Sequence, residues 1–129
     1  MMKSVKVLVI DDDSVTRSLL EKLLRMEKYE TVSVGRISNC NIISLIDQES
    51  PHIIILDCHL GSEDTFKYVP IIREHYSNSS LPILMTSGID RSQESLDVGA
   101  DGFILKPFDW QDVTVRLNHI RDNLICQDA

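Results

Sequence analysis

The sequence lacks any long hydrophobic run, and we expect no signal peptide at its start. A membrane-spanning helix needs ~20 consecutive apolar residues, and no stretch of this chain approaches that length. Cysteine is also scarce, because Cys40, Cys58 and Cys126 are odd in number and lack the spacing of a metal site. Since unpaired thiols are typical of a reducing compartment, we expect free cysteines in a cytoplasmic protein without membrane contact.

Positive charge is in short supply as well. The 13 Lys and Arg residues are outnumbered by 20 Asp and Glu residues, which gives a net charge of -7. Proteins that bind nucleic acid neutralise its phosphates with patches of Lys and Arg, so the composition argues against direct nucleic-acid binding. The length of 129 residues and the hydrophobic content of 43% fit one globular domain, over residues 1–129.

What the sequence does contain is an alternation of short apolar segments with segments of helical periodicity. Three of the apolar segments are hydrophobic at successive positions, as expected for parallel strands that are buried on both faces. Five such units in succession predict an open, doubly wound α/β sheet. The predicted strands are Val5–Ile10, Thr31–Val34, His52–Leu56, Ile83–Thr86 and Gly102–Leu105.

The predicted helices differ in the strength of their patterns. Pro70 falls inside the third helix, which we expect it to kink because proline removes a backbone hydrogen bond. The fourth helix has few apolar residues, and we expect it to be loosely held. Asp13 or Ser14 is expected to cap the first helix. The first predicted helix follows Ser14, and the fifth follows the N-cap Asp109 and ends at Leu124. The three helices between them are Asn39–Glu49, Asp64–Tyr76 and Asp90–Val98.

Polar groups follow four of the five predicted strands at the point where each strand ends. The first strand leads into Asp11, Asp12 and Asp13, and the third ends in Asp57. Clustered carboxylates repel one another and lose hydration on burial, so this cluster predicts a bound cation. The later strands deliver Ser87 with Gly88, and then Lys106 with Pro107, to the same edge of the sheet.

This combination resembles the receiver domain of two-component response regulators over nearly the whole chain. The resemblance implies a flavodoxin-like five-stranded parallel sheet in the order 2-1-3-4-5, with helices on both faces. It implies that Asp57 accepts a phosphoryl group from a phosphohistidine. It further implies that Asp11, Asp12, Asp57 and the backbone carbonyl of His59 hold Mg²⁺, with Asp12 the more direct ligand of the acidic pair.

The resemblance also assigns roles to three residues of the later strands. Lys106 would pair with the phosphoryl group, Ser87 would be the switch hydroxyl, and Phe103 the aromatic switch residue. A cis peptide bond is expected between Lys106 and Pro107. The sequence departs from the commonest family pattern at Gly61, where proline is frequent, and at Phe103, which lacks the hydroxyl of the frequent tyrosine.

The partners implied by the resemblance are a sensor histidine kinase or a phosphotransfer protein. A homodimer would form through the face built by Asp90–Val98, Gly102–Leu105 and Asp109–Leu124. Such a domain catalyses its own phosphorylation and dephosphorylation and acts in signalling rather than as a metabolic enzyme. The sequence leaves open whether the chain acts alone or as part of a longer protein.

A haloacid-dehalogenase-like phosphatase is an alternative that shares the first motif. Such an enzyme would use Asp11 as nucleophile and Asp13 as acid/base. It also needs an acidic metal motif after the lysine, which Asp109 and Asp112 match poorly, and it leaves Asp57 unexplained. A flavodoxin-like FMN carrier is disfavoured because three aspartates would repel its phosphate.

Overall fold

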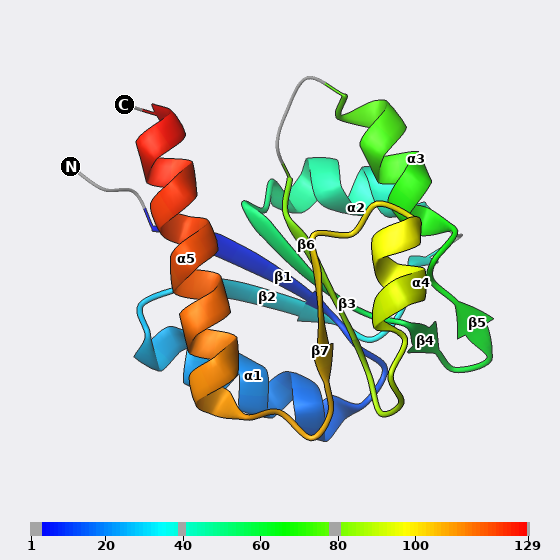
Figure 1. Ribbon diagram of the computed structural model, residues 1–129, viewed down its shortest axis with the longest axis horizontal. Coiled ribbons are helices and arrows are strands. Elements are labelled where there is room, and N and C mark those ends of the chain that lie inside the picture. Colours follow the sequence, from blue (N-terminus) through cyan, green and yellow to red (C-terminus); the bar gives the residue numbers. More distant parts are fainter. Residues whose placement is uncertain (1–3, 39–40, 78–80, 129) are drawn as a thin grey trace.

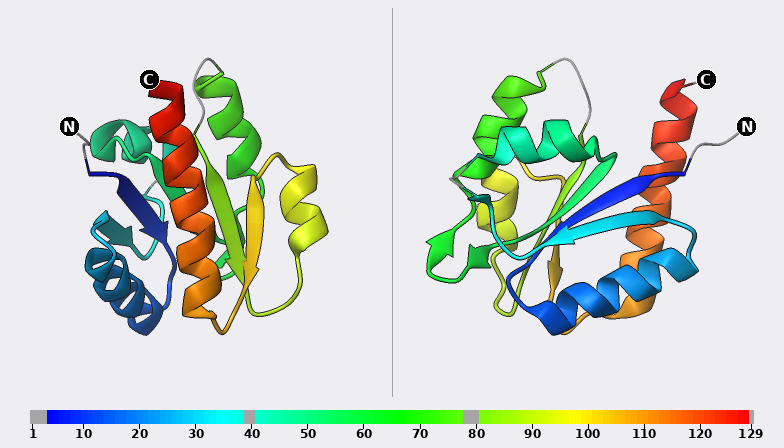
Figure 2. Two further views of the ribbon diagram at one scale, coloured as in Figure 1. Left: turned by 60° about the vertical axis from the view of Figure 1, so that its left-hand side comes forward. Right: turned by 180° about the vertical axis from the view of Figure 1, so that it is seen from behind.

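A computed structural model describes residues 4–38, 41–77 and 81–128, without the side chains of 125–128. The chain forms a five-stranded parallel sheet in the order β2-β1-β3-β6-β7, with helices on both faces (Figure 1, Figure 2). This is the predicted order 2-1-3-4-5 once a short separate hairpin, β4 (His59–Leu60) and β5 (Glu63–Asp64), is left out of the numbering. The sheet strands are β1 (Lys6–Ile10), β2 (Glu30–Val34), β3 (Ile53–Asp57), β6 (Ile83–Ser87) and β7 (Gly102–Leu105).

Five helices connect and cover these strands. They are α1 (Ser14–Met26), α2 (Ile42–Glu49), α3 (Tyr68–His75), α4 (Ser92–Asp97) and α5 (Trp110–Asp128). Helices α2 and α3 contribute buried residues to one hydrophobic cluster, and α1 and α5 contribute to a second cluster on the opposite face. None of the helices in the described part of the chain is long and apolar enough to cross a bilayer.

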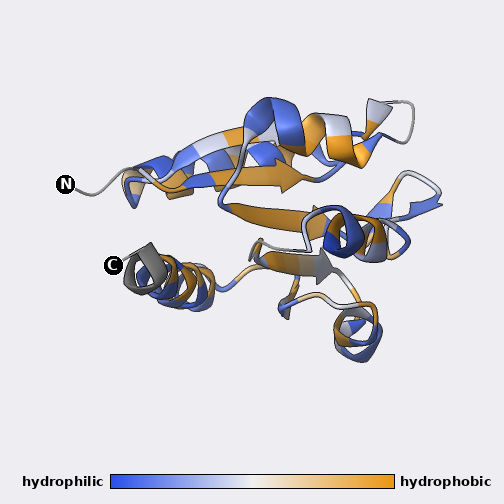
Figure 3. Cartoon of the chain, turned by 90° about the horizontal axis from the view of Figure 1, so that it is seen from above, coloured by the Kyte–Doolittle hydropathy of each residue, from blue (hydrophilic) through white to orange (hydrophobic). Residues whose placement is uncertain are grey.

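The middle of the sheet forms the core. Every residue of β3 and of β6 is buried, and their alternate side chains belong to the two opposite clusters. Figure 3 shows these strands as predominantly hydrophobic, whereas the helices also carry hydrophilic residues. Burial on both faces explains why the sequence of β3 is an uninterrupted apolar run that ends in Asp57.

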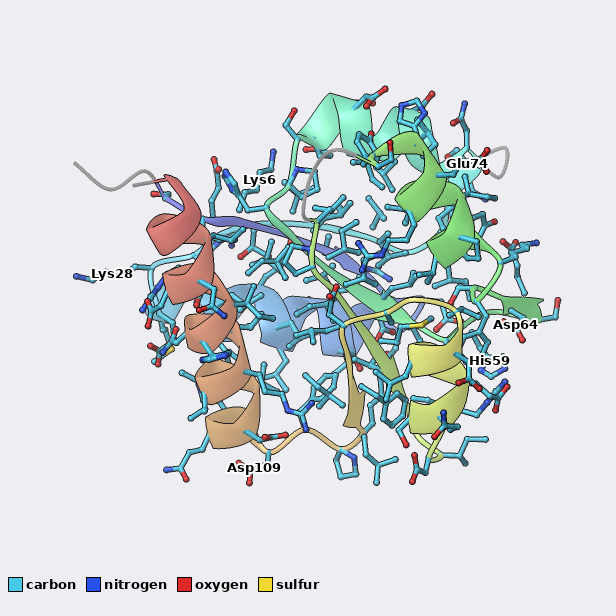
Figure 4. All side chains as sticks on the ribbon, turned by 45° about the horizontal axis from the view of Figure 1, so that its top comes forward. Lys6, Lys28, His59, Asp64, Glu74 and Asp109 are labelled. Carbon is cyan, nitrogen blue, oxygen red and sulfur yellow. The ribbon has the colours of Figure 1, made fainter. Side chains whose placement is uncertain are left out.

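The five predicted strands are confirmed, with each end within one residue of its predicted place. The predicted caps are also present, because the side chain of Asp13 accepts the N–H of Val15 and that of Asp109, labelled in Figure 4, accepts the N–H of Gln111. The peptide bond between Lys106 and Pro107 is cis, as the family resemblance implied.

One expectation was wrong, and one element was missed. The third helix begins only at Tyr68, which places Pro70 in its first turn, where a backbone N–H has no partner within the helix and proline causes no kink. The β4–β5 hairpin was not predicted at all. Its strands have two residues each, and its tip contains Gly61 with a φ of 62°. Strands this short carry too few residues for a recognisable alternation.

Of the three cysteines, Cys58 is a free, buried thiol. Cys40 lies outside the described residues, and so does the side chain of Cys126.

Candidate functional site

The carboxyl ends of β1, β3, β6 and β7 bring the predicted polar groups to one edge of the sheet. Asp57 is paired with Thr86 in the ladder of β3 and β6, and Ser87 is paired with Leu105 in that of β6 and β7. One carboxylate oxygen each of Asp11, Asp12 and Asp57 lies within 4.8 Å of the others. Residues up to 46 positions apart in sequence therefore meet as the sequence predicted.

Lys106 is the cation that joins this acid cluster. Its Nζ lies 2.7 Å from Oδ2 of Asp11 and 3.3 Å from Oδ2 of Asp57. The main-chain N–H of Lys106 donates to the carbonyl of Ser87 at 2.8 Å, which extends the ladder of β6 and β7 as far as the lysine. The main chain at Lys106 is thus fixed to β6, the strand that carries the predicted switch hydroxyl of Ser87.

The three acids have different surroundings. Asp11 is buried, and its Oδ1 accepts the N–H of Asp13 at 2.9 Å. Asp57 is also buried, and its Oδ1 accepts the N–H of His59 at 3.2 Å. Asp12 is exposed, and its Oδ2 accepts the N–H of Gly61 at 2.6 Å. Asp12 is therefore the acid most open to solvent, and the β4–β5 hairpin supplies hydrogen bonds to both Asp12 and Asp57.

Burial and charge together set the protonation of Asp57 and Lys106. Loss of hydration raises the pKa of Asp57 above its ordinary value, and the charge of Asp11 adds to this, while the His59 N–H and Lys106 act in the opposite direction. Burial also opposes the charge of Lys106, but the hydrogen bond and charge of Asp11, together with Asp57, outweigh it and raise the pKa of Lys106. Lys106 therefore remains positive next to a carboxylate that is costly to ionise.

The predicted switch residues lie on the adjoining strands. The hydroxyl of Ser87 is buried at the end of β6, where it accepts the N–H of Ile89 at 3.3 Å. Phe103 is partly buried on β7 and packs against the hydrophobic cluster on the side of α2 and α3. Neither residue contacts the acid cluster through a hydrogen bond within the described residues, so their switch role stays a prediction.

His59 was predicted to act only through its backbone carbonyl, and that role also stays a prediction. Its imidazole turns to α4 instead: Nε2 lies 3.1 Å from Nη1 of Arg91 and must be the acceptor, because a guanidinium only donates. Arg91 also binds Glu94 at 2.6 Å, approaches Asp64 at 3.8 Å and lies over the ring of Phe66. Figure 4 shows His59 and Asp64 next to each other beside α4.

Sequence reasoning missed Arg91 and Thr65. Arg91 links the start of α4 to the hairpin, and the Thr65 hydroxyl donates to the backbone carbonyl of Asp57 at 2.6 Å. Neither residue follows a predicted strand, and hydrophobic periodicity carries no information about such contacts. The sequence gives one hint of such a contact, which is that Thr65 follows Asp57 closely along the chain.

Asp13, the second acid of the phosphatase alternative, does not join the cluster. Its carboxylate is exposed and caps α1, accepting from Val15 and from the hydroxyl of Thr16 at 2.7 Å. The hydrogen bond from Thr16 and that from Val15 lower the pKa of Asp13, which is the reverse of what a general acid requires. The geometry therefore gives the phosphatase alternative no support.

Comparison with known proteins agrees with this geometry. A family model described as the response regulator receiver domain matches residues 7–118. The transcriptional regulatory protein GltR of Pseudomonas aeruginosa is 32% identical over 114 residues, which are 86% of this chain and 46% of GltR. A probable transcriptional regulator, ycf27 of Porphyridium aerugineum, is 27% identical over 92% of this chain and 49% of its own length. The chain thus spans about half the length of these curated relatives.

Solved structures give the same result. A putative response regulator from Chloroflexus aurantiacus is 29% identical with a TM-score of 0.80, over 92% of this chain and 98% of that one. The chemotaxis protein CheY4 of Vibrio cholerae is 25% identical with a TM-score of 0.77, over 92% and 99%. The phosphatase alternative is therefore wrong. With the ends of β1, β3 and β7 meeting at one acid cluster and a family match over most of its length, the chain belongs to the response regulator receiver domain family.

Proposed function

We propose that Asp57 accepts a phosphoryl group from a histidine kinase or a phosphotransfer protein, and that this event changes how the domain meets its partners. The observation that carries the proposal is the bridge of Lys106 between Asp11 and Asp57. A lysine that bridges a carboxylate after β1 and the carboxylate that ends β3 is placed to meet an incoming phosphoryl oxygen, because its positive charge already lies beside the proposed acceptor.

In the proposed reaction an Oδ atom of Asp57 attacks the phosphorus atom of the donor. A P–O bond forms, the P–N bond to the donor histidine breaks, and its electron pair leaves with the imidazole, so that the product is an aspartyl phosphate. The N–H of His59 orients the attacking carboxylate. Lys106 pairs with one phosphoryl oxygen, and the hydroxyl of Ser87 donates to another once the phosphoryl group is in place.

The acid cluster suits Mg²⁺, which prefers oxygen ligands and binds through one or two carboxylates together with phosphate. Three carboxylate oxygens within 4.8 Å of one another and one lysine leave a net negative charge for a cation to balance. Asp11, Asp12, Asp57 and the carbonyl of His59 would hold the ion. When bound, it would neutralise charge on the phosphoryl oxygens during transfer.

The signal would leave the site through the neighbouring edge of the sheet. An oxygen of the phosphorylated Asp57 would draw the hydroxyl of Ser87 inward, and Phe103 would move into the vacated space, which biases a minor state that already exists. The face formed by α4, β7 and α5 carries exposed Leu96, Leu105 and Val115, which suits a second copy of the chain.

Residues 1–129 would act as one receiver domain that catalyses its own phosphorylation and dephosphorylation. An exchange of phosphoryl groups with a histidine kinase implies a cytoplasmic location. The net charge of -7 argues against direct binding of nucleic acid by this domain.

Phosphorylation by a small donor tests the proposal directly. With Mg²⁺ and acetyl phosphate, the intact mass should rise by one phosphoryl group, and the substitution Asp57→Asn should abolish the rise. Asp13→Asn is the matched control, because that carboxylate caps α1 outside the cluster, and labelling should persist. Labelling that survives Asp57→Asn and is found on Asp11 would contradict the proposal.

A further inference from the structure

A buried hydroxyl group lies behind the proposed phosphoacceptor. The exposed fraction of Thr65 is 0%, and its Oγ1 donates a hydrogen bond to the main-chain carbonyl of Asp57 at 2.6 Å. The ladder between β1 and β3 ends at the pair Ile10 and Leu56, so this carbonyl lies one residue past the last pair. Because a buried carbonyl needs a donor, the Thr65 side chain extends the hydrogen bonding of β3 by one residue.

The main chain of Thr65 closes the loop that follows Asp57. Its N–H donates to the carbonyl of Cys58 at 2.9 Å, and its own carbonyl accepts the N–H of Tyr68 at 3.0 Å. Together with the side-chain bond, these contacts join the end of β3, the base of the β4–β5 hairpin and the first turn of α3 at a single residue. Thr65 therefore fixes how the hairpin leaves the sheet.

The hairpin that Thr65 closes reaches the acid cluster at two points. The N–H of His59 holds Oδ1 of Asp57, and the N–H of Gly61 holds Oδ2 of Asp12. Both donors lie between Cys58 and Thr65 in the chain, so a shift at the base of the hairpin changes the direction of both. The backbone and the carboxylate of Asp57 thus depend on the same closure.

We propose that the Thr65 hydroxyl is a positioning group for phosphorylation, which fixes the backbone of Asp57 and the hairpin donors that orient its carboxylate. This inference rests on the proposed function of Asp57. Thr65 is fully buried and acts through Asp57 rather than on the phosphoryl donor. Misplacement of a nucleophile lowers the rate of the chemical step, whereas binding of a small donor depends on other groups.

The valine and serine variants separate the hydroxyl from the shape of the side chain. Thr65→Val keeps the volume but removes the donor, and Thr65→Ser keeps the donor. Thr31→Val is the matched control, because the Thr31 hydroxyl is buried on β2 and has no hydrogen-bond partner among the residues that the structure describes. Each 129-residue chain is treated with Mg²⁺ and a series of acetyl phosphate concentrations, and the initial rate of mass increase is measured.

We expect Thr65→Val to lower the maximal rate about tenfold, which is about 1.4 kcal/mol of activation free energy, with little change in the half-saturating concentration of acetyl phosphate. Thr65→Ser and Thr31→Val should stay within about threefold of the wild-type rate. A wild-type rate in folded Thr65→Val, or an equal loss in the serine and valine variants, would overturn the inference while leaving Asp57 as the acceptor.

Two further outcomes are decisive. If Thr65→Val does not fold by circular dichroism, Thr65→Ser takes its place: a rate within about threefold of wild type supports the inference, and a tenfold loss overturns it. If the wild-type chain itself takes up no phosphoryl group, the proposed function fails, and the inference fails with it.

Discussion

The centre of the sheet and its β7 edge are built in different ways. Every residue of β3 and β6 is buried, whereas β7 buries only Ile104 and leaves Leu105 51% exposed. The helix next to that edge, α4, has six residues, of which only Ser95 is buried. Asp57 thus ends a strand of the packed centre, and the predicted switch residue Phe103 lies on the loosely covered edge.

The two regions therefore differ in the support that they give to their residues. A site that holds several charges within a few ångströms needs rigid support, which the buried strands provide. An element that changes position in response to a signal needs few buried contacts, as at α4 and β7. Lys106 and Ser87 connect the two regions, since the N–H of Lys106 donates to the carbonyl of Ser87.

Replacing one leucine by alanine in each region tests the difference in packing between the centre of the sheet and its β7 edge. Leu56 on β3 is fully buried, so Leu56→Ala should lower the free energy of unfolding by about 3 kcal/mol through lost burial and the cavity left behind. Leu105→Ala on β7 should change it by less than about 0.5 kcal/mol. Chemical denaturation with urea measures both, and equal losses would remove the distinction between centre and edge.

Lys106→Met tests the connection between the regions. The substitution keeps the length of the side chain but removes the charge that lies 2.7 Å from Asp11 and 3.3 Å from Asp57. We expect the rate of phosphorylation by acetyl phosphate to fall about 100-fold, the usual effect of losing one donor to a developing negative charge. Lys22→Met on α1 is the control and should keep the wild-type rate. A wild-type rate in Lys106→Met would count against the role of Lys106 in phosphorylation.

Asp12→Ala tests the proposed metal site. Because Asp12 is the exposed acid of the cluster, its loss should weaken Mg²⁺ binding about tenfold while leaving the ion pair of Asp11 and Lys106 in place. The rise in melting temperature that Mg²⁺ produces should shrink accordingly. Thermal melts over a Mg²⁺ titration measure this, and an unchanged midpoint of the titration would exclude Asp12 as a ligand.

The smallest expected effect concerns the stability of the metal-free chain. Since burial raises the pKa of Asp57, the folded state binds its proton more tightly than the unfolded state, and ionisation costs stability as the pH rises from the ordinary value of 3.8 through the raised value. In EDTA at pH 7, Asp57→Asn should therefore unfold with a higher free energy than wild type, because it removes the buried charge.

The pH dependence of that difference provides the check. The gain should shrink as the pH falls from the raised pKa of Asp57 through 3.8 and vanish below 3.8, where Asp57 of the wild type is protonated in both states. The Thr16 hydroxyl lowers the pKa of Asp13, so the ionised Asp13 stabilises the folded state at pH values above the pKa that it has in the unfolded chain. This contribution is lost on acidification, and Asp13→Asn should therefore not stabilise the chain. Urea denaturation of both chains at several pH values measures this difference. A gain in unfolding free energy for Asp57→Asn that does not change with pH would contradict the role of the Asp57 charge.

Much of the fold could be predicted because its signals are local and repetitive. The continuous apolar runs of β3 and β6, each followed by a helical segment, identify parallel strands, and the groups at their carboxyl ends then fall on one edge. Asp11, Asp57 and Lys106 were found in this way, and the structure brings their charged atoms together.

The parts that could not be predicted depend on single contacts between loops. The β4–β5 hairpin has two residues in each strand, and its attachment depends on Thr65, Gly61 and Arg91, which belong to no periodic pattern. The error at Pro70 has a similar origin, because a difference of four residues in the start of α3 decides whether a proline kinks a helix or begins it. Such boundaries are set by tertiary contacts rather than by local preference.

The central claim is that chemistry at the buried centre is reported at the β7 edge. Amide resonances of the full chain, recorded with Mg²⁺ before and after addition of beryllofluoride as a phosphoryl mimic, test it most directly. The account predicts shifts that extend from the acid cluster across residues 87–106, and shrink in Ser87→Ala although Asp57 remains reactive. Shifts confined to the acid cluster in the wild-type chain would contradict it.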